Sequence, residues 1–194
     1  DMVMCTSELV ADHARKLNRN VVRVDEAVDT SYYIPKTGYD LADPPTLVWT
    51  GQPGNYRYLE MLEEPLARLA RRFDFQVKVV SRTPFRFSSP EIDTAWTPYS
   101  PNDEMDHIRS ADIGLMPLEE GPYQRAKGNF KTKVYMASGL PLVCSRVGMN
   151  LEFISDGESG VFASNSDEWE EKLGTLLSDR TLRERIGRTA RRSV

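Results

Sequence analysis

Apolar residues in this chain occur in two arrangements. Short dense runs are typical of buried β-strands, whereas residues recurring every three or four positions have the spacing of amphipathic helices. The dense runs predict strands at 2–5, 20–24, 46–51, 76–81, 92–97, 111–116, 140–145 and 160–163. The spaced segments predict helices at about 8–17, 59–73, 103–110, 130–138, 167–177 and 181–192, with a helical turn at 150–154.

Predicted strands and helices alternate along most of the chain. Such alternation is typical of a mainly parallel sheet with helices on both faces, and we expect an α/β, Rossmann-like three-layer αβα sandwich. In sheets of this kind a ligand binds outside the carboxyl ends of the strands, where the strand order reverses. Attention therefore falls on the loops that follow Gly51, Ser81, Thr97, Met116 and Ser145.

The segment 27–45 is rich in Pro, Gly, Asp and Tyr and shows no steady period, so we expect a linker there. It divides the chain into a short unit at 1–26 and a Rossmann-like domain at 46–194. The chain begins abruptly with an apolar run, which suggests an excised piece of a longer protein. Pro65 interrupts the pattern at 59–73, and we expect a kink or two abutting helices.

Composition excludes several classes of protein. The net charge of −4 argues against a nucleic-acid-binding domain, which is usually basic. Cys5 and Cys144 lie far apart in apolar contexts and are expected to be reduced core residues of a cytoplasmic protein. The His and Cys residues have no metal-binding spacing, and no apolar run reaches the roughly 18 residues of a membrane span.

One polar loop, at 117–131, combines two lysines with the start of a predicted helix. The free N–H groups and the dipole of a helix start attract anions, and Gly128 lets a ligand approach the backbone closely. Lys127 and Lys131 bracket this point, where cations are unfavourable unless an anion arrives. The pattern favours a phosphate ligand, although lysines in surface loops are more often merely solvated.

The run that follows this loop has a recognisable sequence. Residues 128–143 read GNFKTKVYMASGLPLV, 110–118 read SADIGLMPL and 147–157 read VGMNLEFISDG. These segments resemble, in order and spacing, the signatures YMAAGLPVV, ADIGIMPL and VGxNxEIVxDG of glycosyltransferase family 4. The resemblance covers nearly the whole chain.

The resemblance implies the architecture known as GT-B, in which two Rossmann-like domains face each other across a cleft. The chain would be essentially the C-terminal, donor-binding domain, with residues 1–26 as a remnant of the N-terminal domain and crossover. It implies a retaining glycosyltransferase of the hexosyltransferase type that uses a nucleotide sugar and needs no metal or other cofactor. The sugar or lipid-linked acceptor would be bound mainly by the missing domain, so this fragment alone should be inactive.

The same resemblance assigns roles to particular residues. Lys127 and Lys131, with the backbone of Gly128, Asn129 and Phe130, would bind the diphosphate and stabilise it as it leaves. The loop at 51–55, including Gly51 and Asn55, corresponds to one that approaches the phosphates. Three donor-binding candidates follow a strand where the family holds the base: Trp96, Thr97 and Tyr99; for Trp96 a place in the core is an equal alternative. Glu119 and Val134 complete the donor-binding set that the resemblance implies.

The chain departs from the family at one pair of positions. Many members have two glutamates seven residues apart, of which the second touches the ribose, but here the positions hold Ala126 and Val134. Glu119 or Glu120 could replace a sugar-hydroxyl contact, with solvated loop acids as the alternative. Loss of the pair leaves open a catalytically inactive nucleotide-sugar-binding module.

Two further alternatives concern activity and location. A GT-B sugar-nucleotide epimerase would want acidic and histidine groups in the cleft, and both histidines, His13 and His107, fall on predicted helices. The basic segment 183–192 could contact an acidic membrane surface, which would make a cytoplasmic protein peripheral at the inner face. A solvated helix face is the alternative for this segment.

Overall fold

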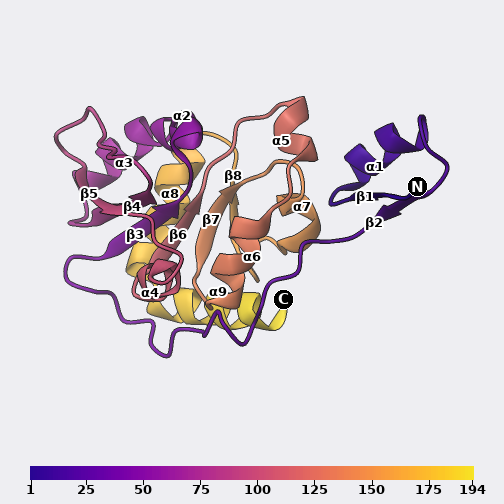
Figure 1. Cartoon of the computed structure of the whole chain (residues 1–194). Helices are drawn as coiled ribbons and strands as arrows, with labels where there is room; N and C mark the ends of the chain where they lie inside the picture. The colour runs from indigo at the N-terminus through magenta and orange to yellow at the C-terminus, as the bar shows by residue number, and fades with distance from the viewer.

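The computed structural model describes all 194 residues and contains a six-stranded, fully parallel sheet in the order β5-β4-β3-β6-β7-β8 (Figure 1). The strands are β3 (Thr46–Thr50), β4 (Gln76–Ser81), β5 (Asp93–Pro98), β6 (Ile113–Met116), β7 (Leu142–Ser145) and β8 (Val161–Ala163). Successive strands add outward from β3 on one side and from β6 on the other, so the strand order reverses between them. The sequence therefore correctly predicted the parallel α/β fold.

Helices of different lengths connect these strands. Their bounds are α2 (Tyr56–Glu60), α3 (Glu63–Ala70), α4 (Glu104–Arg109), α5 (Pro122–Ala126), α6 (Phe130–Ala137), α7 (Asn150–Phe153), α8 (Ser166–Ser178) and α9 (Arg180–Arg192), with a 3-10 turn at Pro53–Asn55. Asn165 and Asp179 cap α8 and α9 by accepting backbone N–H bonds, which explains why these helices begin there. No helix is both long and apolar enough to span a membrane.

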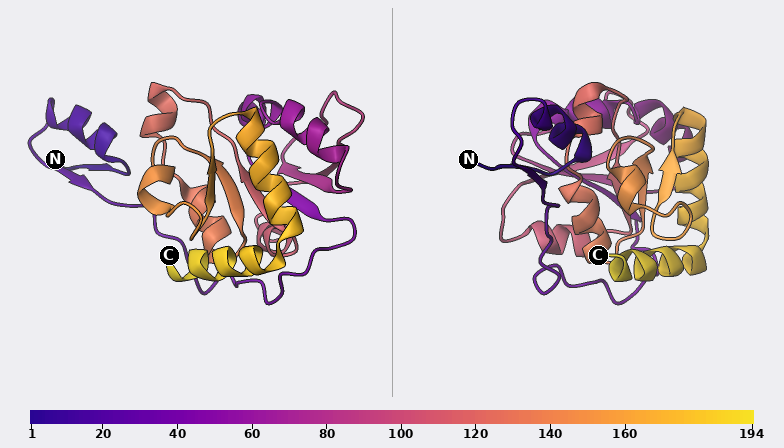
Figure 2. Two further views of the ribbon diagram at one scale, coloured as in Figure 1. Left: turned by 180° about the vertical axis from the view of Figure 1, so that it is seen from behind. Right: turned by 90° about the vertical axis from the view of Figure 1, so that its right-hand side faces the viewer.

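Alternate residues of each strand enter two separate cores. In β3, Leu47 and Trp49 join the core beneath α2, α3 and α8, whereas Val48 joins the core beneath α4 and α6. This alternation follows from the two-residue period of a strand. The α9 helix crosses the end of the sheet and contributes to both cores, through Ile186 and Ala190 (Figures 1 and 2). The result is the expected three-layer αβα sandwich.

Two abutting helices at 59–73 were one of the two predicted outcomes, and the structure confirms them. They meet at Met61–Leu62, so Pro65 falls in the first turn of α3, where a missing N–H costs nothing. The structure differs from the predicted elements in one polar segment. The loop predicted at 117–131 contains the short helix α5, with Pro122 at its first position. A proline after a glycine in a polar stretch reads as a loop, and it also suits a helix start.

The N-terminal residues form a small unit of their own: β1 (Val3–Cys5), α1 (Glu8–Arg15) and β2 (Val21–Arg23), with the two strands parallel. Figures 1 and 2 show it beside the main domain, reached by the 27–45 segment, which has no helix or strand. The Ser7 hydroxyl donates to the Ala126 carbonyl at 2.9 Å, and Arg23 pairs with Glu152 at 2.6 Å. The division at 26 and 45 stays a prediction. Both cysteines are buried and free, as expected.

Candidate functional site

A cavity of about 210 Å³ opens at the carboxyl end of the sheet, beside the point where the strand order reverses. The end of β3, the start of α4 and the first turn of α6 surround it. Its lining residues are Thr50, Gly51, Gln52, Tyr99, Glu104, Phe130, Lys131 and Val134. Chain topology thus brings together residues from three separate stretches of sequence, where ligands bind in open α/β sheets.

Lys131 is the main positive group of this cavity. Its Nζ lies 4.4 Å from the centre of the Trp49 ring, and it forms no ion pair. Burial lowers the pKa of Lys131 to about 7; repulsion from Lys127 adds to this shift, and Glu104 opposes it. Lys131 is thus a desolvated cation that Lys127 repels and only an aromatic ring contacts. Binding of an anion beside it would be favourable.

Lys127 lies at the end of α5, in extended backbone, and also lacks an ion pair. Its Nζ is 5.9 Å from the centre of the Tyr58 ring. The Tyr58 hydroxyl accepts a bond of 2.6 Å from Gln124, which also donates to Glu119 at 2.9 Å. This hydrogen-bond network holds the aromatic ring beneath Lys127.

The first turn of α6 contributes backbone donors next to the lysines. Asn129 is the N-cap residue but makes no capping bond with its side chain, so the first amides of the helix are left for another acceptor. Its side chain is buried and donates instead to the Met149 carbonyl at 3.3 Å. The Asn129 Oδ1 has no hydrogen-bond partner.

At two positions around the cavity, only glycine leaves room for a neighbouring side chain. A Cβ on Gly51 would collide with the Trp49 ring, which is the surface on which Lys131 rests. A Cβ on Gly128 would collide with the Glu26 carboxylate from the crossover segment. Glu26 also binds the Nζ of buried Lys133 through its carbonyl at 2.8 Å, so this part of the crossover is held against the lysine-bearing loop.

The predicted site residues divide into three groups. Gly51, Tyr99, Phe130, Lys131 and Val134 line the cavity. Lys127, Gly128 and Asn129 form the loop that leads into α6. The predicted residues outside the cavity lining are Asn55, Trp96, Thr97 and Glu119.

Each residue outside the lining has another place in the structure. Asn55 ends the 3-10 turn after β3, and Thr97 lies within the edge strand β5. Trp96 is in the same strand and donates to the Ser81 Oγ at 3.1 Å. Glu119 pairs with Arg57 at 3.1 Å. The core tryptophans are Trp49 and Trp169, whereas Trp96 is only partly buried.

Sequence reasoning missed Glu104, a half-buried carboxylate in the first turn of α4 that lines the cavity. Burial raises the pKa of the Glu104 carboxyl; hydrogen bonding to Tyr33 and attraction by Lys131 oppose this rise. An acid in a first helical turn suits the helix dipole, so its position alone carried no signal of a site.

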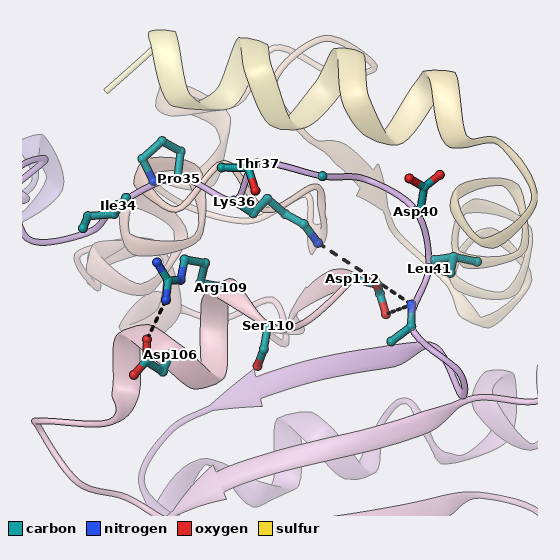
Figure 3. Close-up of a pocket in the computed structure, with 12 residues that line it drawn as sticks. Ile34, Pro35, Lys36, Thr37, Asp40, Leu41, Asp106, Arg109, Ser110 and Asp112 are labelled. Atoms are coloured by element: carbon teal, nitrogen blue, oxygen red, sulfur yellow. Dashed lines mark hydrogen bonds and ion pairs between the residues drawn. The ribbon is translucent and has the colours of Figure 1, made fainter.

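A larger hollow of about 630 Å³ lies at the opposite, amino end of the sheet, between residues 34–42 of the linker and the end of α4 (Figure 3). Its charged side chains pair with one another or with backbone carbonyls. Lys36 donates to the Ala111 carbonyl at 2.5 Å and lies 3.9 Å from Asp112, and Arg109 pairs with Asp106 at 3.1 Å. This hollow holds the linker to the domain and offers no unsatisfied charge to a ligand.

No three His, Cys, Asp or Glu side chains converge as potential metal ligands. Neither histidine lines the cavity: His13 is in α1 and His107 in α4. The cavity therefore offers lysines, one carboxylate, backbone amides and an aromatic surface. Such groups can bind a polyanion and its attached hydroxyls.

Solved structures with a similar fold cover most of the chain. The C-terminal domain of a group 1 glycosyltransferase, LpcC from Francisella tularensis, has a TM-score of 0.67 at 16% identity, covering 87% of this chain and 96% of that one. A glycosyltransferase from Rickettsia africae has a TM-score of 0.76 at 16% identity, covering all of this chain and 58% of that one. HepE from Anabaena, solved with UDP and glucose, has a TM-score of 0.78 at 13% identity, covering 98% of this chain and 57% of that one.

Sequence comparison gives the family. Spore coat protein SA of Bacillus subtilis is 38% identical over 62 residues, which are 30% of this chain and 16% of that protein, so the match spans a small part of the relative. Residues 44–179, well over half of the chain, match the sequence profile of the family described as glycosyl transferases group 1. The GT-B relatives in the structural comparison agree with this match. The chain therefore belongs to the group 1 glycosyltransferases.

Proposed function

We propose that this chain is the donor-binding domain of a retaining, hexosyltransferase-type glycosyltransferase, and that the cavity beside Lys131 binds the nucleoside diphosphate part of a nucleotide sugar. The observation that carries the proposal is the unpaired, desolvated Lys131, whose pKa is lowered to about 7 beside a second unpaired lysine, Lys127. A diphosphate would relieve the repulsion between the two cations and accept hydrogen bonds from both.

The chemistry assigned to this site is stabilisation of the leaving group. As the glycosidic bond to the donor breaks, negative charge grows on the departing diphosphate. In the proposal, Lys131 in the cavity, Lys127 in the adjoining loop and the first amides of α6 stabilise that charge. One preorganised donor of this kind is worth about 2.7–4 kcal/mol in a transition state.

The donor is proposed to be a uridine diphosphate sugar. The support comes from relatives: structures of HepE from Anabaena are described as complexes with UDP and with UDP-glucose. In the proposal the sugar or lipid-linked acceptor is bound mainly by a preceding domain, and no metal takes part. The two buried free cysteines suit a reducing compartment, so a cytoplasmic location completes the proposal.

The test is titration of the 194-residue chain with UDP, GDP and ADP by calorimetry. We expect at least one of them to bind with a dissociation constant below millimolar, and UDP to bind most tightly. Glycerol phosphate and UMP, which lack the diphosphate, serve as matched controls and should bind much more weakly. If all three diphosphates fail to bind at millimolar concentration, the proposed diphosphate site is wrong.

A second candidate function is that of a nucleotide-sugar-binding module without turnover. Val134 favours it, because this buried side chain stands in the cavity wall where many relatives carry a glutamate. Joining this domain to a complete N-terminal domain and assaying hydrolysis of UDP-glucose would separate the two. Binding without turnover in the complete protein would favour the module.

The arginines of the basic helix α9, considered above for contact with a membrane, mostly bind within the protein. Arg183 is buried and donates to the carbonyls of Tyr39, Leu176 and Leu177. Arg191 donates to three other carbonyls, and Arg188 pairs with Glu184 at 2.9 Å. Few guanidinium groups of this helix are left to meet an acidic surface.

A further inference from the structure

The cavity contains one carboxylate, Glu104, which the leaving-group chemistry does not use. A diphosphate repels a carboxylate, so an acid in such a place is unfavourable unless the ligand also brings hydrogen-bond donors to it. The donors available on a nucleoside diphosphate are the ribose hydroxyls and the N–H groups of the base. Glu104 therefore requires an explanation that the diphosphate alone does not give.

The Glu104 carboxylate forms no ion pair with another residue. It forms no ion pair with Lys131, whose Nζ lies over the Trp49 ring, although each group shifts the pKa of the other. Tyr33, a buried linker residue, lowers the pKa of this carboxyl, but no hydrogen bond of ordinary length joins the two side chains. A carboxylate has about four acceptor sites, and here they are left for a ligand.

The position of Glu104 indicates whether it contacts the ribose or the base of a bound nucleotide. Glu104 and Lys131 line the same cavity of about 210 Å³, so the carboxylate lies near the group that would hold the diphosphate. In a nucleotide the ribose is directly attached to the phosphates, whereas the base lies one unit farther away. Tyr99, which lines the same cavity, offers the base an aromatic ring, which a carboxylate does not.

We propose that Glu104 recognises the ribose of the donor by accepting hydrogen bonds from its 2′- and 3′-hydroxyls, and so supplies from α4 the carboxylate that Val134 on α6 does not. The two side chains line the same cavity. This inference rests on the proposed nucleotide site, and it makes the domain selective for ribonucleotides.

The experiment compares UDP with 2′,3′-dideoxy-UDP, using calorimetry on the 194-residue chain and its Glu104→Gln variant; GDP or ADP and its dideoxy form replaces UDP if it binds more tightly. Hydrogen bonds to a charged group predict that the unmodified chain prefers the ribonucleotide by roughly 10- to 100-fold. The Glu104→Gln variant should bind both compounds within about threefold of each other. Glu104→Ala is a second variant with the same expectation.

Asp103→Asn is the matched control, because it removes a neighbouring, exposed negative charge outside the cavity. It should leave the ratio between the two compounds unchanged. The inference is overturned if Glu104→Gln keeps the full ratio, or if it weakens both compounds equally, which would mean that Glu104 contacts the base. Failure of every diphosphate to bind the unmodified chain would instead overturn the proposed function itself.

Discussion

The two ends of the sheet carry hollows of opposite character. The hollow at the amino end is three times larger, about 630 Å³ against about 210 Å³, and it is rich in charged groups. Each hollow also contains a lysine whose pKa is lowered by burial, Lys36 at the amino end and Lys131 at the carboxyl end. Size and charge content alone would favour the hollow at the amino end as a ligand site.

The difference lies in what each lysine contacts. Lys36 has a carbonyl at 2.5 Å and the carboxylate of Asp112 at 3.9 Å, so its charge is compensated within the fold. Lys131 has an aromatic ring and a repelling lysine instead. A compensated buried charge stabilises the structure, whereas an uncompensated one is tolerated where a ligand completes it. This difference supports the smaller cavity as the proposed binding site.

The largest expected effect comes from removing the two lysines in turn. Lys131→Met should weaken UDP binding roughly 10- to 100-fold, because a charge-assisted hydrogen bond is lost, and should leave the melting temperature unchanged or higher. Lys36→Met should show the reverse: a loss of about 1–3 kcal/mol in the free energy of unfolding, with UDP affinity intact. Calorimetry and urea denaturation measure the two quantities. A stability loss in Lys131→Met larger than that in Lys36→Met would reverse the comparison.

A smaller effect is expected from pH. The free pKa of Lys131 is about 7, and a bound diphosphate would raise it because an opposite charge favours the protonated form. Below pH 7 the lysine is already charged; above it, binding must take up a proton, so affinity falls as pH rises. Between pH 7 and 9, where the charge of the terminal phosphate changes little, we expect a loss of about tenfold or more in UDP affinity.

Lys131→Met provides the control for this dependence, since it removes the titrating group. The affinity of the variant should change little over the same range of pH. Lys127 and Glu104 are the other charged groups that act on Lys131. An equally steep profile in the variant would assign the dependence to another group.

The smallest expected effect concerns the crossover. The Glu26 carboxylate lies against Gly128, beside the proposed diphosphate site. Glu26→Gln removes this negative charge and should raise UDP affinity about two- to threefold at low salt, with the gain lost at high salt. Asp25→Asn, on the neighbouring residue, should change UDP affinity less. Equal gains in the two variants would indicate a general charge effect.

The candidate site was only partly predictable, as Lys131 and Lys133 show. The two residues are close in sequence and lie on opposite faces of α6. Lys131 faces the cavity, whereas Lys133 is buried, donates to the Glu26 carbonyl at 2.8 Å and lies 4.1 Å from the Phe153 ring centre. Helical spacing indicates that they point apart, but only packing decides which one meets the crossover and which one meets a ligand.

The sequence by itself determined the elements and their class, because the two-residue period of the strands and the alternation with helices leave few other folds. It also placed Lys127 and Lys131 at a helix start, since that signal is local. The Trp49 surface under Lys131, the carboxylate of Glu104 and the approach of Glu26 to Gly128 were decided only by the tertiary structure. Each of these contacts joins residues far apart along the chain, and no local pattern encodes such a meeting.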